Sequence, residues 1–286
     1  PPHMRAQALG YVALGSMSGL VISPLLVKIA ETFGPPNGLD AMALQWFFMP
    51  VLILGGVVLI SFVRPDPKTI GMNLKDYYPD YEPPPRRAAA QTRDFRASAL
   101  LRHPTARLAI VSNCAGTGNM SIVMVLTSLV LAHHGHSMVA IAISHTFHSA
   151  GMFAFTIPLG KLADRFGNGR VMYPGVAVSL VGAAFVAFTG DMWSVTLGTF
   201  LVGLGWAAAN VAATATLADM FPTEERGRAI GVNDSFAGGV TVFAAVVTGP
   251  LIELAGLPAT GLTAVLLAII PFVLLALDRS RTAEAR

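Results

Sequence analysis

The sequence predicts an all-α protein that crosses a membrane several times. Of its 286 residues, 53% are hydrophobic and only 12% are charged, and the mean hydropathy is +0.61. A soluble domain of ordinary composition carries about 25% charged residues. The apolar residues gather into stretches close to the ~20 residues that a helix needs to cross a bilayer. Almost all basic residues lie in alternate connectors between these stretches or at the two ends, so we expect a polytopic bundle of about eight helices.

The candidate spans and the charges between them set the topology. The spans cover residues 8–33, 41–63, 106–132, 138–159, 171–189, 193–217, 229–253 and 259–277. The connectors on one side, which contain no Lys or Arg, are 34–40, 132–137, 190–192 and 254–258. Apart from Lys28, all basic residues lie in or beside the other connectors and the two ends. Because Lys and Arg accumulate on the cytoplasmic side, we expect both termini in the cytoplasm.

The longest connector, residues 64–105, differs in composition from the spans. It contains Arg64-Pro65-Asp66-Pro67 and later Glu82-Pro83-Pro84-Pro85-Arg86-Arg87. Proline and charge at this density favour a flexible linker. Its later part, residues 92–101, is compatible with a short helix on the inner membrane surface.

The connector after span 138–159 carries the most specific motif, G-x-L-A-D-R-x-G-x-x-R over residues 160–170. Gly160 and Gly167 allow a close helix approach and a sharp turn. Asp164 is placed to meet the positive end of a helix, and Arg165 and Arg170 hold the loop on the cytoplasmic side. The motif resembles the cytoplasmic loop signature of the major facilitator superfamily of secondary transporters.

The resemblance implies a mechanism and its partners. Two six-helix bundles would rock about a central site that binds a small solute, driven by an ion gradient, expected to be H⁺, rather than by ATP. The loop around Asp164 would lock one state by contacting the start of the first span, near residues 5–10. The bilayer, the solute and the ion gradient are therefore the expected partners, with no cofactor. Few charged residues lie in the half of the central cavity that this sequence supplies, which weakly favours export of the solute over import.

Two spans resemble one another. The first opens with Arg5-Ala6-Gln7-Ala8-Leu9-Gly10 and the seventh with Arg226-Gly227-Arg228-Ala229-Ile230-Gly231. This similarity suggests parallel repeats, although R-x-x-A-x-G is a weak pattern that also arises by chance. Equal repeats predict that the chain is helices five to twelve of a twelve-helix transporter. The expected parts are the last two helices of the first half at 1–63, the cytoplasmic linker at 64–105, a six-helix half at 106–278 and a tail at 279–286.

Three ionisable residues inside spans are candidates for proton coupling. An ionisable group at the centre of a membrane helix costs about 2.5–3.5 kcal/mol, so its presence calls for a reason. His145 and His148 lie three residues apart on one face of span 138–159, and Asp234 lies about two turns into span 229–253. Histidine titrates near physiological pH, so two histidines facing a carboxylate across a water-filled cavity would form a proton site. The alternative is that each residue hydrogen-bonds to a neighbouring helix and has a structural role.

Uncharged polar residues provide a second set of candidates. Asn113, Asn119 and Asn210 lie within spans, where they either line the cavity or join helices. Trp206, beside Gly205, either stacks on an aromatic solute or packs in the core. His133, His134 and His136 form a short cluster in an outer connector, but without a thiol or carboxylate nearby we expect no metal site.

Absences narrow the class of function. The sequence contains no G-x-S-x-G elbow, no H-E-x-x-H and no phosphate-binding G-x-x-x-x-G-K-[ST], so we expect neither an enzyme nor an ATP-driven pump. The basic residues lie between spans rather than on one face, which argues against a nucleic-acid partner. We expect a secondary transporter of the bacterial inner membrane. The alternative is a truncated, non-transporting protein, or a half-transporter that needs a partner chain.

Overall fold

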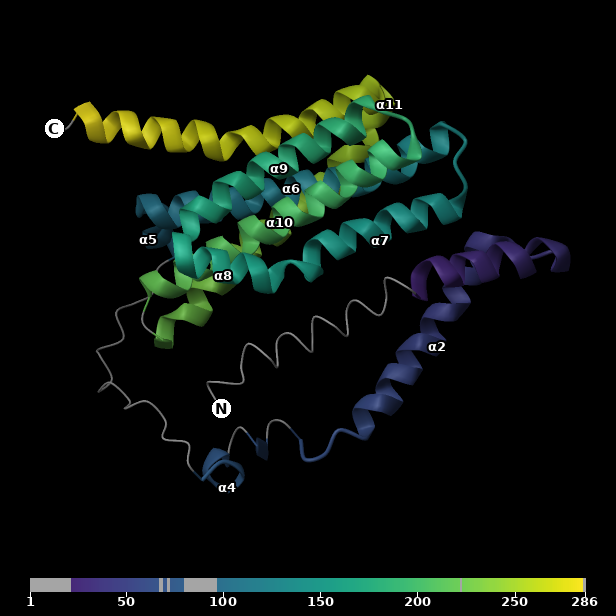
Figure 1. Ribbon diagram of the computed structural model, residues 1–286, viewed down its shortest axis with the longest axis horizontal. Helices are drawn as coiled ribbons and strands as arrows, with labels where there is room; N and C mark the ends of the chain where they lie inside the picture. Colours follow the sequence, from purple (N-terminus) through teal and green to yellow (C-terminus); the bar gives the residue numbers. More distant parts are fainter. Residues whose placement is uncertain (1–21, 67–68, 71–72, 80–96, 222, 285–286) are drawn as a thin grey trace. The chain divides into compact units, whose positions relative to one another are not determined.

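The computed structural model describes residues 22–66, 69–70, 73–79, 97–221 and 223–284. Every regular element among these residues is a helix, which confirms the predicted fold class. The described residues form two compact units, one within residues 22–79 and one within residues 97–284. Each unit is described by itself (Figure 1).

The first unit is dominated by α2 (Ala41–Ser61), a helix that is apolar on every side. Asp40 caps its N-terminus by accepting a hydrogen bond from the Met42 N–H at 3.0 Å. The mean hydropathy of α2 reaches 2.2 and none of its residues is buried. A helix of this kind is typical of a membrane span, as predicted for 41–63. Helical residues 22–33 and the 3₁₀ turn η2 (Pro35–Asn37) precede it, and the short α4 (Leu74–Tyr77) follows it. The first predicted span is therefore described only from residue 22 onwards.

The second unit contains the long helices. They are α5 (Ala97–Arg102), α6 (Pro104–His133), α7 (Met138–Ala154), α8 (Thr156–Phe166), α9 (Asn168–Phe188), α10 (Met192–Met220) and α11 (Thr223–Glu284). The helices α6, α9 and α10 are each long and apolar enough to cross a membrane, and so is the continuous stretch from Met138 to Phe166. These elements match the spans predicted between residues 106 and 217.

Helix α11 comprises two spans. Its apolar stretch, Glu225–Leu277, has 53 residues, which at 1.5 Å per residue is ~80 Å and far exceeds one bilayer. Gly256, with φ of 79° and ψ of 174°, interrupts the helix, between the predicted spans 229–253 and 259–277. We call residues 223–255 the first arm and residues 257–284 the second arm. Both arms meet α6 at Gly118, where an added Cβ atom would lie 2.7 Å from Val240 and 3.4 Å from Leu267.

The span predicted at 138–159 is broken in the structure. Helix α7 ends at Ala154 and α8 begins at Thr156, because Pro158 has no N–H to donate to the carbonyl of residue 154. Helix α8 then continues to Phe166. The prediction of a loop from residue 160 was therefore wrong, since the Leu-Ala-Asp-Arg segment at its centre is helical and only Gly167 separates α8 from α9. Gly167 has φ of 94° and ψ of 145°, a conformation open essentially only to glycine.

Small residues allow α9 and α10 to pack closely. A Cβ atom added at Gly182 of α9 would lie 2.5 Å from the Gly198 carbonyl oxygen and 2.8 Å from the Val202 nitrogen of α10. One added at Gly175 would lie 2.5 Å from the Cβ of Ala208. Glycine at these positions lets the two backbones touch, as is common between helices in membranes. The closely packed α10 of this pair also supplies Trp206 and Asn210 to the candidate site.

The segment predicted to be a linker contributes one helix to the second unit. Its predicted helix at 92–101 is described as α5 from Ala97 to Arg102, and the rest of the predicted range lies outside the described residues. Leu100 is 1% exposed and belongs to a core cluster with Ala106 and Ala109 of α6. This contact fixes α5 at the end of α6 where the span begins.

Candidate functional site

One side of α6 carries a row of polar residues that reach the neighbouring helices. Asn113, Thr117, Ser121 and Ser128 are spaced by four, four and seven residues, which places them on one helix face. We call these four residues the polar α6 face. Asn113 and Thr117 are buried, whereas Ser121 and Ser128 remain partly exposed, so the face runs from the core of the unit to its surface.

Each residue of the polar α6 face has a partner on another helix. From α10, Asn210 donates to Asn113 Oδ1 at 3.2 Å and the Trp206 Nε1–H donates to Thr117 Oγ1 at 3.1 Å. From the first arm of α11, Thr241 Oγ1 lies 3.4 Å from Ser121 Oγ. From α7, His145 Nε2 lies 2.9 Å from Ser128 Oγ. The face thus joins α6 to α10, to the first arm of α11 and to α7.

The two candidate histidines contact different helices. His145 is partly exposed and bonds to Ser128 of α6. His148 is 2% exposed, and its Nδ1 lies 2.8 Å from the Thr199 carbonyl oxygen of α10. Because a carbonyl oxygen only accepts, His148 Nδ1 carries a proton and donates it. His148 therefore connects α7 to α10, whereas His145 lies beside the polar α6 face.

The hydroxyl groups of Thr127 and Ser144 lie within 3.3 Å of the hydroxyl of Thr199, the residue whose carbonyl accepts from His148. Thr199 Oγ1 donates to the Val195 carbonyl at 2.6 Å, and Thr127 Oγ1 donates to the Val123 carbonyl at 2.8 Å. The hydroxyl of Ser144 lies 3.2 Å from Thr199 Oγ1, and it supplies the proton for that bond because the Thr199 proton is already used. The cluster fixes α6, α7 and α10 to one another around His148.

The three candidate asparagines have different environments. Asn119 is fully buried, donates to the Ala264 carbonyl at 2.9 Å and accepts from Ser179 Oγ at 3.1 Å. Asn119 therefore joins α6 to α9 and to the second arm, and both ends of its amide are occupied. Asn113 is 1% exposed and accepts from Asn210, but its Nδ2 has no hydrogen-bond partner among the described residues. This free donor lies next to Asn210, which is partly exposed.

Asp234 lies on an exposed face of the first arm. It is nine residues beyond Glu225, where the apolar stretch of the arm begins, which corresponds to ~14 Å along the helix, and it therefore lies within the span. The Asn233 Nδ2 donates to its Oδ1 at 3.1 Å. Asp234 shares its exposed side of the helix with Gly231, Ser235 and Gly238. We call these four residues the open α11 face.

The open α11 face adjoins the polar α6 face. Thr241, which contacts Ser121, lies seven residues beyond Asp234 and therefore on the same side of the arm. The separation along the helix is ~10 Å. An added Cβ atom at Gly231 or Gly238 would meet nothing within 4 Å, so this side of the arm is open in the unit. A carboxylate at this depth is expected to face water or a partner group.

The predicted switch motif is a helix end and a one-residue junction rather than a simple loop. Asp164, Arg165 and Arg170 are all exposed at the junction of α8 and α9, and the Arg165 guanidinium carbon lies 5.2 Å from the centre of the Phe166 ring. Gly160 is helical, with open space around it, so it makes no close contact within the described residues. The segment predicted to meet Asp164, residues 5–10, lies outside the described residues.

The connectors that link α6 to α7 and α9 to α10 carry hydrogen bonds between protein groups. His136 Nε2 donates to the Gly190 carbonyl at 3.0 Å, and His134 Nδ1 donates to the Val130 carbonyl at 2.8 Å. Asp191 caps α10, and hydrogen bonds from Ser194 hold the pKa of the Asp191 carboxyl below its ordinary value. Within the described residues, no group of three His, Cys, Asp or Glu side chains is arranged to hold a metal ion.

The sequence did not identify the hydroxyl residues of the site. Thr117, Ser121, Ser128 and Thr241 are common in membrane helices and were not singled out. Their spacing along α6 is a detectable signal, but their partners on α7, α10 and α11 depend on which helices are neighbours.

Comparisons with known proteins show the family of the chain. The family model of the Major Facilitator Superfamily matches residues 108–286. The riboflavin transporter RfnT of Brucella anthropi is 26% identical over 297 aligned residues, which cover 99% of this chain and 67% of that protein. The uncharacterised MFS-type transporter YdeG of Bacillus subtilis is 25% identical over 80% of this chain and 53% of its own length.

A third relative matches a shorter segment. The inner membrane transport protein YajR of Escherichia coli is 31% identical over 56% of this chain and 34% of its own length. The chain thus spans two thirds of the first of these relatives and about half or less of the other two. With its helical fold and its apolar spans, the chain is a multi-pass membrane protein that belongs to the Major Facilitator Superfamily of membrane transporters.

Proposed function

We propose that the protein is a secondary active transporter that moves a small polar solute by alternating access and couples this movement to protons. The observation that carries the proposal is the contact between two faces, the polar α6 face and the open α11 face, at Ser121 and Thr241. Together they place hydrogen-bonding side chains and a carboxylate on one continuous surface within the span. Solute and proton sites of such transporters lie near the bilayer midplane.

Asp234 is the proposed proton carrier. A charged carboxylate within a span is costly, whereas a protonated one is much less so, so binding and release of a proton change the energy of exposing Asp234 to either side. The Asn233 amide donates to Asp234 and keeps the carboxylate oriented. The position of Asp234 beside small residues leaves room for water to deliver the proton.

We propose His145 as the second group that binds the transported proton, and we propose a structural role for His148. His145 is partly exposed and faces the polar α6 face through Ser128. His148 is buried and donates to a backbone carbonyl, which gives it a structural role. The two histidines, although three residues apart, therefore differ in function.

The surroundings of Trp206 favour a planar solute with several polar groups. Its indole nitrogen is held by Thr117, and its ring borders Gly116, whose added Cβ atom would lie 4.0 Å from the indole Cδ1. A held, partly exposed aromatic ring is suited to stacking. Asn113 and Asn210 lie one turn away and offer an amide donor and acceptor. The similarity to a protein named as a riboflavin transporter makes riboflavin the first solute to test.

The α8–α9 junction is the proposed switch. Asp164, Arg165, Gly167 and Arg170 would hold one state of the transport cycle through cytoplasmic contacts. Gly160 would permit a close approach of the other half. In this proposal residues 1–63 belong to one half, residues 64–105 link the halves, residues 106–278 form the other half, and residues 279–286 are a tail.

The proposed location is the bacterial inner membrane, with both termini in the cytoplasm. The distribution of Lys and Arg supports this orientation. The junction that holds Asp164 is then cytoplasmic, and the connectors around His136 and Gly190 face outward.

Transport by the purified protein in liposomes tests the proposal. Riboflavin movement would be followed with an imposed pH gradient and then with the gradient collapsed by a protonophore. The expected result is movement against a concentration gradient only while the pH gradient lasts. Absence of any movement of riboflavin would remove this substrate. Movement that is unaffected by the protonophore would contradict proton coupling.

A further inference from the structure

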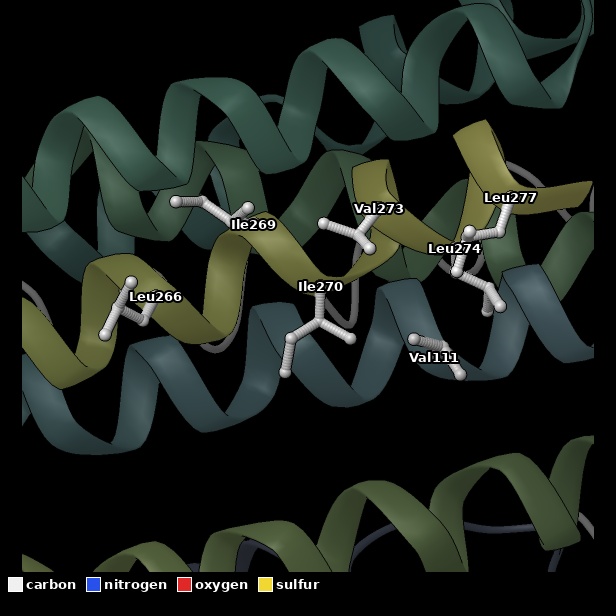
Figure 2. A pocket seen from close by; sticks show the side chains of 7 residues that line it. All are labelled: Val111, Leu266, Ile269, Ile270, Val273, Leu274 and Leu277. Carbon is white, nitrogen blue, oxygen red and sulfur yellow. The ribbon is translucent and has the colours of Figure 1, made fainter. Parts of the chain in front are cut away.

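A groove lined only by aliphatic side chains runs between α6 and the second arm of α11. It has a volume of about 450 Å³ and is lined by Val111 of α6 and by six Leu, Ile and Val residues between Leu266 and Leu277. Figure 2 shows these side chains along the second arm, with Ile270 pointing towards α6 and Val111 lying opposite Leu274. The groove is separate from the polar α6 face.

The dimensions of the groove match one leaflet of a bilayer. The lining residues from Leu266 to Leu277 fall in two adjacent rows with spacings of three and four residues, so they form a single stripe on the helix. The stripe extends over eleven residue steps, or ~17 Å, and half of the ~30 Å hydrocarbon core is ~15 Å. Because Val111 lies near the first turns of α6 and Leu277 near the end of the second arm, the groove lies in the inner leaflet under the orientation proposed above.

The side chains of the groove are those of a lipid site rather than of a helix contact. Helices that pack together in membranes use Gly, Ala, Ser and Thr to bring their backbones close, as Gly182 and Gly198 do between α9 and α10. All the residues that line the groove are Val, Leu or Ile. Branched aliphatic side chains on both walls leave a channel that a flexible acyl chain fills better than a helix.

Basic residues mark the inner end of the groove. Arg107 lies one turn before Val111 on the same side of α6, and Arg102 is exposed at the end of α5. The α6 side of the groove is thus preceded by two arginines at the end expected at the inner surface, where basic pockets between spans bind anionic lipid headgroups.

We propose that this groove binds one acyl chain of an anionic phospholipid of the inner leaflet. The phosphate of the lipid interacts with Arg107 and Arg102 at the inner end, and the chain lies against Ile270, Val273 and Leu274. The lipid would cover an apolar surface of the six-helix half and stabilise the packing of the second arm on α6.

Native mass spectrometry of the purified full chain with added phosphatidylglycerol or phosphatidylcholine tests the proposal. The expected result is retention of phosphatidylglycerol in preference to phosphatidylcholine. Ile270→Trp and Val111→Phe each fill the groove, and we expect each to lower the affinity for phosphatidylglycerol about tenfold, since the chain loses contact for about two methylene groups. Leu262→Trp, an exposed position of the same arm outside the groove, is the matched control and should bind as the wild type does.

The headgroup part of the proposal has its own pair of variants. Arg107→Gln should lower the preference for phosphatidylglycerol about fivefold, as expected for one basic group near an anionic lipid, whereas Arg107→Lys should retain most of it. Equal retention of the two lipids by the wild type, or unchanged binding in both groove-filling variants, would overturn the proposal. Transport is not measured in this experiment, so its outcome is independent of the proposed coupling through Asp234.

Discussion

At the scale of single residues, chemically similar side chains have different roles because their surroundings differ. Asn119 uses both ends of its amide within the bundle, whereas Asn113 keeps a free donor beside Asn210. His148 donates to a backbone carbonyl in the core, and His145 bonds to a serine on a partly exposed face. Burial and partners, rather than residue type, therefore decide which of these residues can act on a solute or a proton.

The two histidines provide the first prediction. His145→Gln should change the pH dependence of transport while the protein stays folded, because the titratable ring is lost next to the polar α6 face. His148→Gln should lower the free energy of unfolding by about 1–3 kcal/mol, the cost of disturbing a buried hydrogen bond, and leave the pH profile of the remaining activity unchanged. Transport rates from pH 5 to 8 and thermal unfolding of both variants measure these effects. An altered pH profile in His148→Gln alone would reverse the assignment.

At the scale of the helices, glycine positions are explained by backbone contacts or by backbone conformation. Gly182 and Gly198 permit contact between α9 and α10, and Gly167 joins α8 to α9 with a positive φ. The sequence predicted the turn at Gly167 from the motif. It did not predict that residues 160–166 would be helical, because the motif was interpreted as a loop although its centre consists of good helix formers. The break at Phe155 was also missed, since the apolar run continues across Pro158.

Packing of α9 on α10 gives the second prediction. Gly182→Ala places a methyl group 2.5 Å from the Gly198 carbonyl oxygen, and overpacking of this kind costs about 1–3 kcal/mol. We expect a lower midpoint of thermal unfolding in detergent. Gly169→Ala in the first turn of α9 is the matched control, because its added methyl group would be 3.7 Å from Tyr173, an ordinary contact. Equal stability of the two variants would show that the close α9–α10 contact is absent.

The α8–α9 junction gives the third prediction. Gly167→Ala forces a side chain into a backbone region that costs about 1–3 kcal/mol, so the junction should change its conformation and transport should fall. Gly160→Ala occupies open space within a helix and should not reduce the stability of the purified protein. Proteolysis at the junction and transport in liposomes report the two effects. Wild-type behaviour of Gly167→Ala would contradict the conformation of the junction.

At the scale of the whole molecule, hydrophobic length and charge predicted the class of protein well. The spans from residue 41 onwards correspond to helices of the structure, and the boundary between the last two predicted spans falls at Gly256. The partners of the site were less predictable. Periodicity assigns a residue to a face of a helix, but the contact between Ser121 and Thr241 depends on which helices become neighbours. For the same reason, the sequence grouped His145 with His148, although their rings contact different helices.

Orientation in the membrane gives the fourth prediction. Cys114 is the single cysteine of the chain, so Cys114→Ala provides a cysteine-free background. In that background, His133→Cys should react with a membrane-impermeant maleimide in intact cells, and Lys161→Cys should react only after the membrane is permeabilised. Both positions are exposed in the structure, so accessibility depends on the side of the membrane. The opposite pattern of labelling would invert the topology.

The most direct measurement of the central claim compares wild-type protein and Asp234→Asn in the same liposomes, using riboflavin or another solute that the wild type transports. With a pH gradient, the wild type should move the solute against its concentration gradient. Asp234→Asn should only equalise the solute concentrations on the two sides, and it should still exchange labelled for unlabelled solute. Asparagine conserves the shape of the side chain, but its amide does not bind and release a proton as a carboxylate does. Gradient-driven accumulation by Asp234→Asn at the wild-type level would contradict the assignment of Asp234 as the proton carrier.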